Sequence, residues 1–229
     1  MSNHIDPELS EAARAPLTRA VVLISGSGSN LQAFIEQIKS GDLPLDIVLV
    51  ISNKHDAYGL TRASNAAIAT STIDHRDFDS RATFDQALMR EIDAVQPDLI
   101  ILAGFMRILT AEFVNHYHNR LVNIHPSLLP KYPGTNTHQR AIDAGDQWHG
   151  ASIHFVVPEV DAGPIILQGR LGVRPDDTNQ SLQQRIHKIE HALYPLAVKW
   201  FAENRLTIET DKVLLDGESS TQQLQTFEV

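Results

Sequence analysis

Three short, mostly apolar runs limit what this chain can fold into more than any other feature. The runs are AVVLIS, LDIVLVISN and DLIILAG, over residues 20–25, 45–53 and 98–104. Runs this short and apolar on both faces are typical of strands buried in a parallel sheet. Between the second and third runs, residues 83–96 carry apolar side chains at helical spacing. Strands that alternate with helices predict an α/β fold with a doubly wound, mostly parallel sheet.

The last third of the chain has a different pattern of predicted strands and helices. Residues 151–157 and 163–173 are predicted strands. Residues 181–204 have the pattern of one long helix, which Pro195 should interrupt or end because proline lacks the N–H of the helical hydrogen bond. Residues 205–218 then predict a β-hairpin. The expected architecture is therefore a doubly wound sheet followed by a long C-terminal helix and a hairpin.

Composition and charge narrow the class of protein. The chain has 229 residues, no cysteine and a formal net charge of −9. The absence of cysteine excludes disulfides, thiolate nucleophiles and cysteine-bound zinc. Proteins that bind nucleic acid usually carry a basic surface, so the acidic balance favours small-molecule substrates and no nucleic-acid partner. No apolar run approaches the roughly 20 residues of a membrane span, and residues 1–8 lack the pattern of a signal peptide. We therefore expect a cytoplasmic protein with no membrane partner.

The chain shows no internal repeat, low-complexity segment or obvious linker. Residues 1–17 are polar and contain two prolines, which predicts a flexible N-terminal tail. We expect residues 18–229 to form a single domain, since that length and apolar content suit one sizeable core.

A glycine-rich turn, ISGSGSN, joins the first predicted strand to the first predicted helix at residues 24–30. The dinucleotide-binding fingerprint needs a third glycine where Leu31 stands, and no Gly-Lys-Ser/Thr follows, so both common nucleotide motifs fail. Backbone N–H groups and hydroxyls at a helix start can still hold one phosphate. An ordinary strand-to-helix turn would use the same glycines, and the motif alone leaves both interpretations open.

Asn123 and His125 stand two apart at the end of the fourth predicted strand, in LVNIHP. Alternate strand residues point to one face, and ligands of α/β sheets bind at the carboxyl ends of strands. An imidazole there can exchange a proton near neutral pH, and an amide N–H can donate to a developing oxyanion. The carboxylate that orients such an imidazole would be Asp161 in PEVDAGPI, with Glu159 as its competitor. Hydrogen bonds to loop backbone, or capping of a turn by Asp161, would explain the same residues without catalysis.

Two other patterns point to no additional chemistry. His187 and His191 are four apart on the predicted long helix, a spacing that permits a metal pair, but no H-E-x-x-H is present and we predict no metal site. No G-x-S-x-G occurs, so a nucleophilic serine has no support.

Several stretches together resemble the family of folate-dependent formyltransferases that act on glycinamide ribonucleotide. They are VVLISGSGSNLQAFIE, VISNK, AYGLTRA, DLIILAGFMRILT, LVNIHPSLLPKYPG, HGASIHFVVPEVDAGPIILQ and IHKIEHALYPLAVKWF. The combination of NIHPSLLP with a downstream D-x-G-P is the most specific feature. The resemblance implies transfer of a formyl group from the co-substrate 10-formyltetrahydrofolate to the amine of glycinamide ribonucleotide, in de novo purine biosynthesis and without a metal.

The resemblance also implies roles for individual residues. The catalytic residues would be Asn123, His125 and Asp161. The ribonucleotide phosphate and ribose would contact Gly28, Ser29, Asn30 and Glu190. The folate cleft would comprise Met106, Arg107, Ile108, Leu109, Val156, Val157, Glu159 and Val160. The N-terminal half of the domain would bind the ribonucleotide and the C-terminal half the folate. Ser27 stands where many relatives carry Asn, and Asn136 replaces a common His.

Other functions fit parts of the pattern. Formyltetrahydrofolate deformylase shares the catalytic residues but usually has an added N-terminal regulatory domain, for which residues 1–17 leave no room. Methionyl-tRNA formyltransferase needs an added C-terminal domain and a basic surface. A sugar-nucleotide formyltransferase is also conceivable, although the glycine turn favours a phosphomonoester. A non-catalytic folate or nucleotide-binding module is the alternative from another class, and a homodimer is compatible with all of these.

Overall fold

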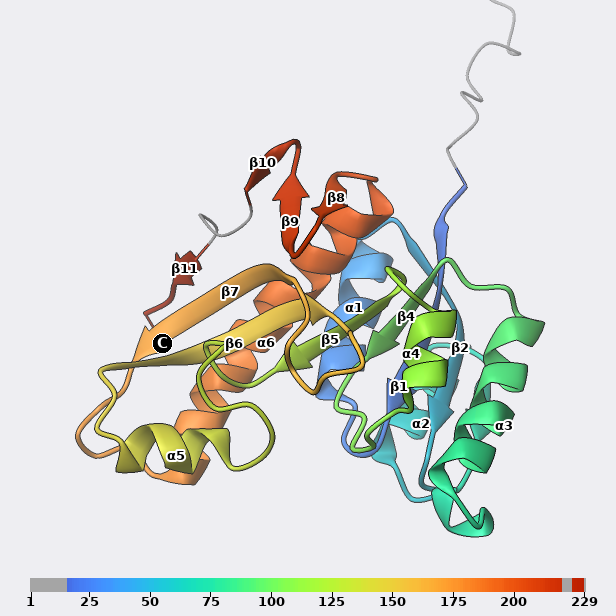
Figure 1. Ribbon diagram of the computed structural model, residues 1–229, viewed down its shortest axis with the longest axis horizontal. Helices are drawn as coiled ribbons and strands as arrows, with labels where there is room; N and C mark the ends of the chain where they lie inside the picture. Colours follow the sequence, from blue (N-terminus) through green and yellow to red (C-terminus); the bar gives the residue numbers. More distant parts are fainter. Residues whose placement is uncertain (1–15, 220–223, 229) are drawn as a thin grey trace, which may run out of the picture.

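An eight-stranded sheet forms the centre of the structure, a computed structural model that describes residues 16–219 and 224–228. Its order is β11-β7-β6-β5-β4-β1-β2-β3 (Figure 1). The strands span Thr18–Ile24 (β1), Leu45–Ser52 (β2), Thr70–Thr72 (β3), Leu99–Leu102 (β4), Leu121–His125 (β5), Trp148–Phe155 (β6), Ile165–Gly172 (β7) and Leu224–Thr226 (β11). Neighbours from β3 to β5 run parallel, β6 is antiparallel to β5 and to β7, and β11 is parallel to β7. The predicted doubly wound, mostly parallel sheet is confirmed.

Helices cover both faces of this sheet (Figure 1). They span Ser29–Ser40 (α1), Tyr58–Asn65 (α2), Arg81–Ala94 (α3), Ala111–His116 (α4), Thr137–Asp143 (α5) and Asn179–Ala202 (α6), with a short 3-10 turn at His75–Asp77. Alternate residues of β1 point to opposite faces. Val22 and Ile24 pack into the core with α1, α2 and α6, whereas Val21 and Leu23 pack into the core with α3 and α4.

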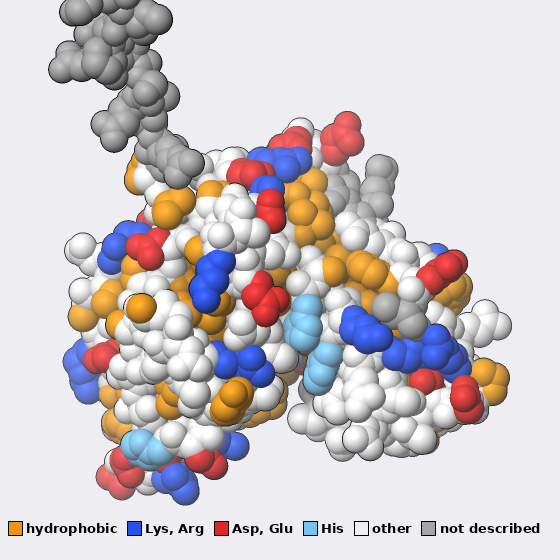
Figure 2. Space-filling view, turned by 180° about the vertical axis from the view of Figure 1, so that it is seen from behind, with side chains coloured by type: hydrophobic (Ala, Val, Ile, Leu, Met, Phe, Trp, Pro, Cys, Tyr) orange, Lys and Arg blue, Asp and Glu red, His pale blue; other side chains and the backbone are white. Residues whose placement is uncertain are grey.

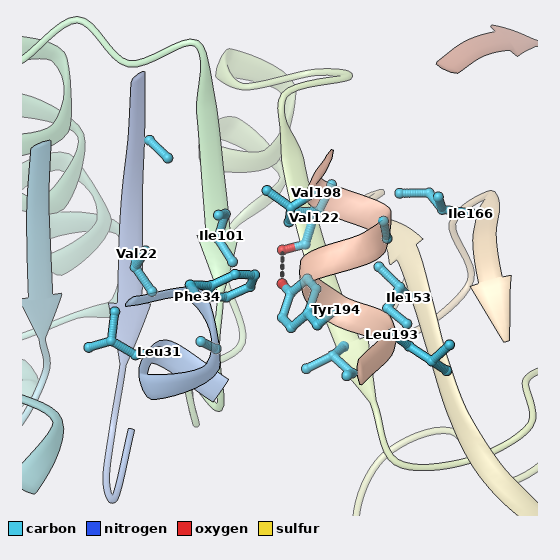
Figure 3. Close-up of a cluster of buried hydrophobic side chains, with 14 of the residues drawn as sticks. Val22, Leu31, Phe34, Ile101, Val122, Ile153, Ile166, Leu193, Tyr194 and Val198 are labelled. Atoms are coloured by element: carbon cyan, nitrogen blue, oxygen red, sulfur yellow. Dashed lines mark hydrogen bonds between the residues drawn. The ribbon is translucent and has the colours of Figure 1, made fainter. Parts of the chain in front are cut away.

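Tyr194 of α6 ties the helical layer to the middle of the sheet (Figure 3). Its ring meets Phe34 of α1 edge-on, with centroids 5.1 Å apart. Its buried hydroxyl lies 3.1 Å from the backbone carbonyl oxygens of Leu102 and Val122, to which it donates. A buried polar group costs free energy unless it is hydrogen-bonded, so these contacts fix the height of α6 over β4 and β5.

The expectation that Pro195 interrupts or ends the long helix is wrong. Helix α6 continues through Pro195 to Ala202. Proline in a helix interior costs about 3 kcal/mol, because a hydrogen bond is lost and the ring crowds the preceding turn. Burial along the whole apolar face offsets this cost. That face comprises Leu182, Ile186, Ile189, Leu193, Tyr194, Ala197, Val198 and Trp200.

The predicted hairpin follows α6 and consists of Leu206–Glu209 (β8) and Lys212–Leu215 (β9). Glu218–Ser219 (β10) adds a third strand to it. Val213 and Leu215 anchor this small sheet to the main core. Residues 1–15 of the predicted tail lie outside the described residues, so the tail stays a prediction. None of the helices over residues 16–219 is long and apolar enough to cross a membrane.

Candidate active site

The predicted catalytic residues come from β5 and from the turn after β6. Asn123 and His125 lie on β5 with Ile124 between them, and β6 places His154 opposite Asn123 and Ser152 opposite His125. Asp161 lies in the turn that joins β6 to β7. Because β5 and β6 are antiparallel, β6 ends beside the start of β5, with Phe155 opposite Val122. The turn after β6 must therefore extend along β5 to bring Asp161 to His125.

Both ring nitrogens of His125 face oxygen atoms. Nε2 lies 2.9 Å from the carbonyl oxygen of Tyr132, and Nδ1 lies 3.4 Å from Oδ2 of Asp161. Both side chains are largely shielded, with 7% and 11% of their surfaces exposed. A carbonyl can only accept, so Nε2 carries a hydrogen and donates to Tyr132. Nδ1, which faces Asp161, is therefore the ring nitrogen that is free to exchange a proton or to bind another partner.

The Asp161 carboxylate is held from several sides. Its Oδ2 accepts a hydrogen bond from the backbone N–H of Gly134 at 2.8 Å, and its backbone is left-handed, with φ of 54°. Aspartate tolerates this conformation better than most residues. Gly163 closes the same turn against the carbonyl of Phe155, where any Cβ would overlap the oxygen. The turn therefore has little freedom to move Asp161 away from His125.

His154 is a buried member of this cluster that the sequence did not single out. Its Nδ1 lies 2.8 Å from the carbonyl oxygen of Phe155, and its Nε2 lies 3.2 Å from Nδ2 of Asn123. Burial lowers the pKa of His154, which keeps the ring neutral. Nδ1 must then carry the hydrogen, and Nε2 accepts from the Asn123 amide. Oδ1 of Asp161 lies 3.9 Å from the same Nε2, so His154 lies beside both Asn123 and Asp161, although the neutral ring donates nothing to the carboxylate.

The glycine turn leads into α1 without a side-chain cap. Gly28 is the N-cap residue, with φ of 68°, and no side chain accepts from the first turn. A Cβ on Gly28 would lie 2.6 Å from the Cα of Gly59, because the start of α2 packs directly on the turn. The backbone N–H of Gly59 also donates to the carbonyl of Gly26 at 3.0 Å. The N–H groups at the start of α1, from Ser29 and Asn30 onward, are thus available to an anion.

Glu190 of α6 faces the start of α1. Its Oε2 accepts a hydrogen bond from Nδ2 of Asn30 at 3.0 Å, and its burial raises the pKa of the carboxyl group to about 7. Oδ1 of Asn30 is buried without a partner among the described residues. Buried polar atoms are normally satisfied, so this pair is arranged for a polar ligand. Residues from both halves of the chain meet here.

A hollow of about 310 Å³ opens beside Ser29, between α1, α2 and α6. Arg62 and His191 line it, and Nε2 of His191 is buried without a hydrogen-bond partner among the described residues. Figure 2 shows two histidine side chains at a crevice on the face seen from behind, with an acidic side chain directly beside them and basic side chains on either side. Arg62 gives this hollow a positive charge, and Glu36 in the same lining gives it a negative one.

The segment after β4 presents apolar side chains to the outside. Met106 is 70% and Ile108 is 55% exposed, whereas Leu109 is buried. Nε of Arg107 is buried without a hydrogen-bond partner among the described residues. Exposed apolar side chains next to a buried, unpaired donor are typical of a ligand cleft.

The second predicted folate segment, residues 156–160, lies near the first, residues 106–109, at one end only. Val156 packs into the same core as Leu109. Val160 is 52% exposed, near Asp161. Val157 and Glu159 instead line a hollow of about 630 Å³ against β8 and β9. Over residues 16–219 and 224–228, no group of three or more His, Asp or Glu side chains is arranged to hold a metal ion.

An amide, an imidazole and a carboxylate gathered at β5, with an uncapped helix start after β1, are the kind of groups found in the active site of an α/β enzyme. The family model of formyl transferases matches residues 18–198, and the chain belongs to that family. It is 51% identical over 198 residues to the phosphoribosylglycinamide formyltransferase of Escherichia coli (strain K12), covering 86% of this chain and 93% of that relative.

Solved structures agree with this assignment. The phosphoribosylglycinamide formyltransferase from Coxiella burnetii matches with a TM-score of 0.87 and 49% identity, covering 91% of this chain and 99% of that one. A formyltetrahydrofolate deformylase from Pseudomonas syringae pv. tomato matches with a TM-score of 0.82 at 25% identity, covering 88% of this chain and 66% of that one. The sequence is thus much more similar to the transferases than to this hydrolase.

Proposed function

We propose that this chain transfers a formyl group from 10-formyltetrahydrofolate to the amino group of glycinamide ribonucleotide, in de novo purine biosynthesis. The products are N-formylglycinamide ribonucleotide and tetrahydrofolate. One observation carries the proposal: a chain 51% identical to a phosphoribosylglycinamide formyltransferase has Asn123, His125 and Asp161 gathered in one cluster around His154.

The ribonucleotide binds across α1 and α6 in this proposal. Its phosphate accepts hydrogen bonds from the backbone N–H groups of Gly28, Ser29 and Asn30 and from the hydroxyl of Ser29, because an uncapped helix start attracts an anion. Glu190 accepts from a ribose hydroxyl, and Asn30 keeps an unpaired amide oxygen beside it. The amino end of the substrate then extends toward the carboxyl end of β5.

The formyl folate binds in this proposal between the loop after β4 and the turn that contains Asp161. Met106 and Ile108 on one loop and Val160 on the other offer exposed apolar surface to a flat ring system. The unpaired Nε of Arg107 offers a donor at the base of the first loop. This co-substrate supplies the formyl carbon, and the residues of the chain hold it against the amine.

The reaction exchanges one carbon–nitrogen bond for another. The amine nitrogen attacks the formyl carbon, and the bond from that carbon to the folate nitrogen breaks. Negative charge develops on the formyl oxygen meanwhile. Asn123 donates to this oxygen through the amide hydrogen that does not face His154, and protonated His125 donates through Nδ1. No metal and no covalent enzyme intermediate takes part in this scheme.

Asp161 has two roles in this scheme: it stabilises a positive charge on His125, and it assists the transfer of a proton. Its carboxylate stabilises the His125 imidazolium across the 3.4 Å gap. The amine must lose one proton and the folate nitrogen must gain one, and Asp161 assists this transfer, directly or through a water molecule. Gly134 and the left-handed backbone keep the carboxylate in place for both tasks.

A spectrophotometric assay of folate release, with and without glycinamide ribonucleotide, tests the proposal. Release that depends on the ribonucleotide, with formylated product in equal amount, is the expected result. Release without an amine acceptor would replace the proposal with a deformylase. No release in either case would leave a binding module or another acceptor. We also propose a cytoplasmic location and small-molecule partners, while a homodimer stays a prediction.

A further inference from the structure

Ser25 connects the two substrate loops of the proposed enzyme by a hydrogen bond. It is the first residue after β1, directly before Gly26, and it is 5% exposed. Its Oγ accepts a hydrogen bond from the backbone N–H of Met106 at 2.7 Å. Met106 is the first residue of the exposed apolar segment assigned to folate. The serine thus joins the end of β1 to the loop that follows β4.

Asn53, at the end of β2, orients the Ser25 hydroxyl. The Ser25 O–H donates to Oδ1 of Asn53 at 2.6 Å, and Asn53 is 1% exposed. A hydroxyl has one hydrogen, so this donation turns an oxygen lone pair toward the Met106 N–H. Nδ1 of His75 lies 3.1 Å from Nδ2 of Asn53 and 3.2 Å from the backbone oxygen of the same residue. The ends of β1 and β2 and the loop after β4 are therefore connected through two buried side chains, those of Ser25 and Asn53.

The same loop is fastened at its other end. The backbone N–H of Thr110 donates to Oδ2 of Asp85 at 2.6 Å. Phe105 and Leu109 are 8% exposed, whereas Met106 and Ile108 between them point outward. The outward side chains consequently depend on where Ser25 and Asp85 hold the backbone, because their own contacts with the core are few.

We infer that Ser25 is a positioning residue for the formyl folate, holding the Met106 backbone so that the exposed segment can receive the folate ring. This inference rests on the proposed function. It assigns to Ser25 a role distinct from the neighbouring glycine turn, which serves the ribonucleotide. A merely structural serine would affect stability, or both substrates equally.

Steady-state kinetics of Ser25→Ala, with each substrate varied in turn, separate these roles. Loss of the buried hydrogen bond should raise KM for the formyl folate about tenfold. KM for glycinamide ribonucleotide and kcat should stay within about twofold. Asn53→Ala keeps the serine hydroxyl but frees its rotation, so a smaller rise, about threefold, is expected in the same KM. This second variant carries the test if Ser25→Ala does not fold.

Ser52→Ala is the matched control. Ser52 is also buried, ends β2 beside Ile24, and bonds to the backbone of Lys54 instead of the folate loop. It should lower thermal stability without raising KM for the folate. The inference is overturned if KM for the folate is unchanged in Ser25→Ala, or rises equally in Ser52→Ala. If the wild-type chain transfers no formyl group, the proposed function fails first, and binding of a formyl-folate analogue to Ser25→Ala then tests the loop alone.

Discussion

Nδ2 of Asn123 lies 3.2 Å from Nε2 of His154, its direct partner across β5 and β6. Because Nδ1 of His154 donates to Phe155, the contact fixes which end of the Asn123 amide faces the imidazole. It also leaves Asp161 to His125, since a neutral His154 does not compete for the carboxylate. A residue outside the predicted catalytic set thus determines how that set is oriented.

Replacing His154 by Phe should therefore impair turnover more than binding. The amide of Asn123 loses its acceptor and can rotate but is not removed, so we expect kcat to fall about tenfold, less than the roughly 100-fold or more for losing an oxyanion donor outright. Both KM values should change little. His154→Gln supplies an amide oxygen as acceptor and should recover part of kcat. Equal kcat in the Phe variant and the wild type would contradict this role.

Asp161→Asn isolates the charge of the carboxylate. The amide oxygen can still accept from Gly134, and Asn tolerates the left-handed backbone, so the fold should be kept. Without the charge that stabilises protonated His125, kcat should fall roughly 100-fold. Unchanged circular dichroism and folate binding are the controls. A variant with wild-type kcat would show that Asp161 only caps the turn.

Gly28→Ala tests the phosphate turn. The substitution forces a Cβ into left-handed backbone and against Gly59, so the turn must shift. We expect KM for glycinamide ribonucleotide to rise about tenfold or more. Gly41→Ala is the control, because Gly41 has the same strained backbone, with φ of 83°, but lies at the other end of α1. It should lower stability by about 1 kcal/mol and leave KM unchanged.

Glu190 gives the unfolding free energy a pH dependence with a definite sign. Its pKa is about 7 in the folded chain against 4.5 as the ordinary value. The folded state therefore holds the proton more tightly, and stability falls as pH rises from about 4.5 to about 7. The loss should reach roughly 3 kcal/mol relative to Glu190→Gln, which keeps an acceptor for Asn30.

Urea unfolding of both chains at pH 5 and pH 8 checks this. The difference between the two chains is the relevant quantity, because other groups titrate in the same range. Burial lowers the pKa of His138 and of His149 to about 4, so these rings contribute stability that is lost as pH falls from about 6.5 to about 4. A difference that is independent of pH would contradict the raised pKa of Glu190.

Local pattern predicted most of the fold. The apolar runs of β1, β2 and β4 and the amphipathic α3 carry their periodicity in adjacent residues, and all were predicted. Strand β11 pairs with β7 from far along the chain, and its own three residues are exposed, so no periodic signal marks it. The continuous course of α6 through Pro195 follows from packing over its whole length, which sequence spacing alone does not measure.

The site was predictable where chemistry and strand ends coincide. Asn123, His125 and Asp161 could be named because a polar pair ends an apolar strand and an acid follows in a turn. His154 and Ser25 were missed because each is a buried polar residue within or directly after a buried strand, a pattern that core packing also produces. Their roles depend on register between strands, as when β6 sets His154 opposite Asn123.

The turnover of His125→Ala, with both substrates saturating, tests the central claim most directly. We predict a kcat at least roughly 100-fold below that of the wild type, because the donor to the formyl oxygen and the partner of Asp161 are lost together. KM values should stay within a few-fold, since the phosphate and folate contacts lie elsewhere. A kcat equal to that of the wild type would contradict the assignment of the Asn123, His125 and Asp161 cluster as the site of formyl transfer.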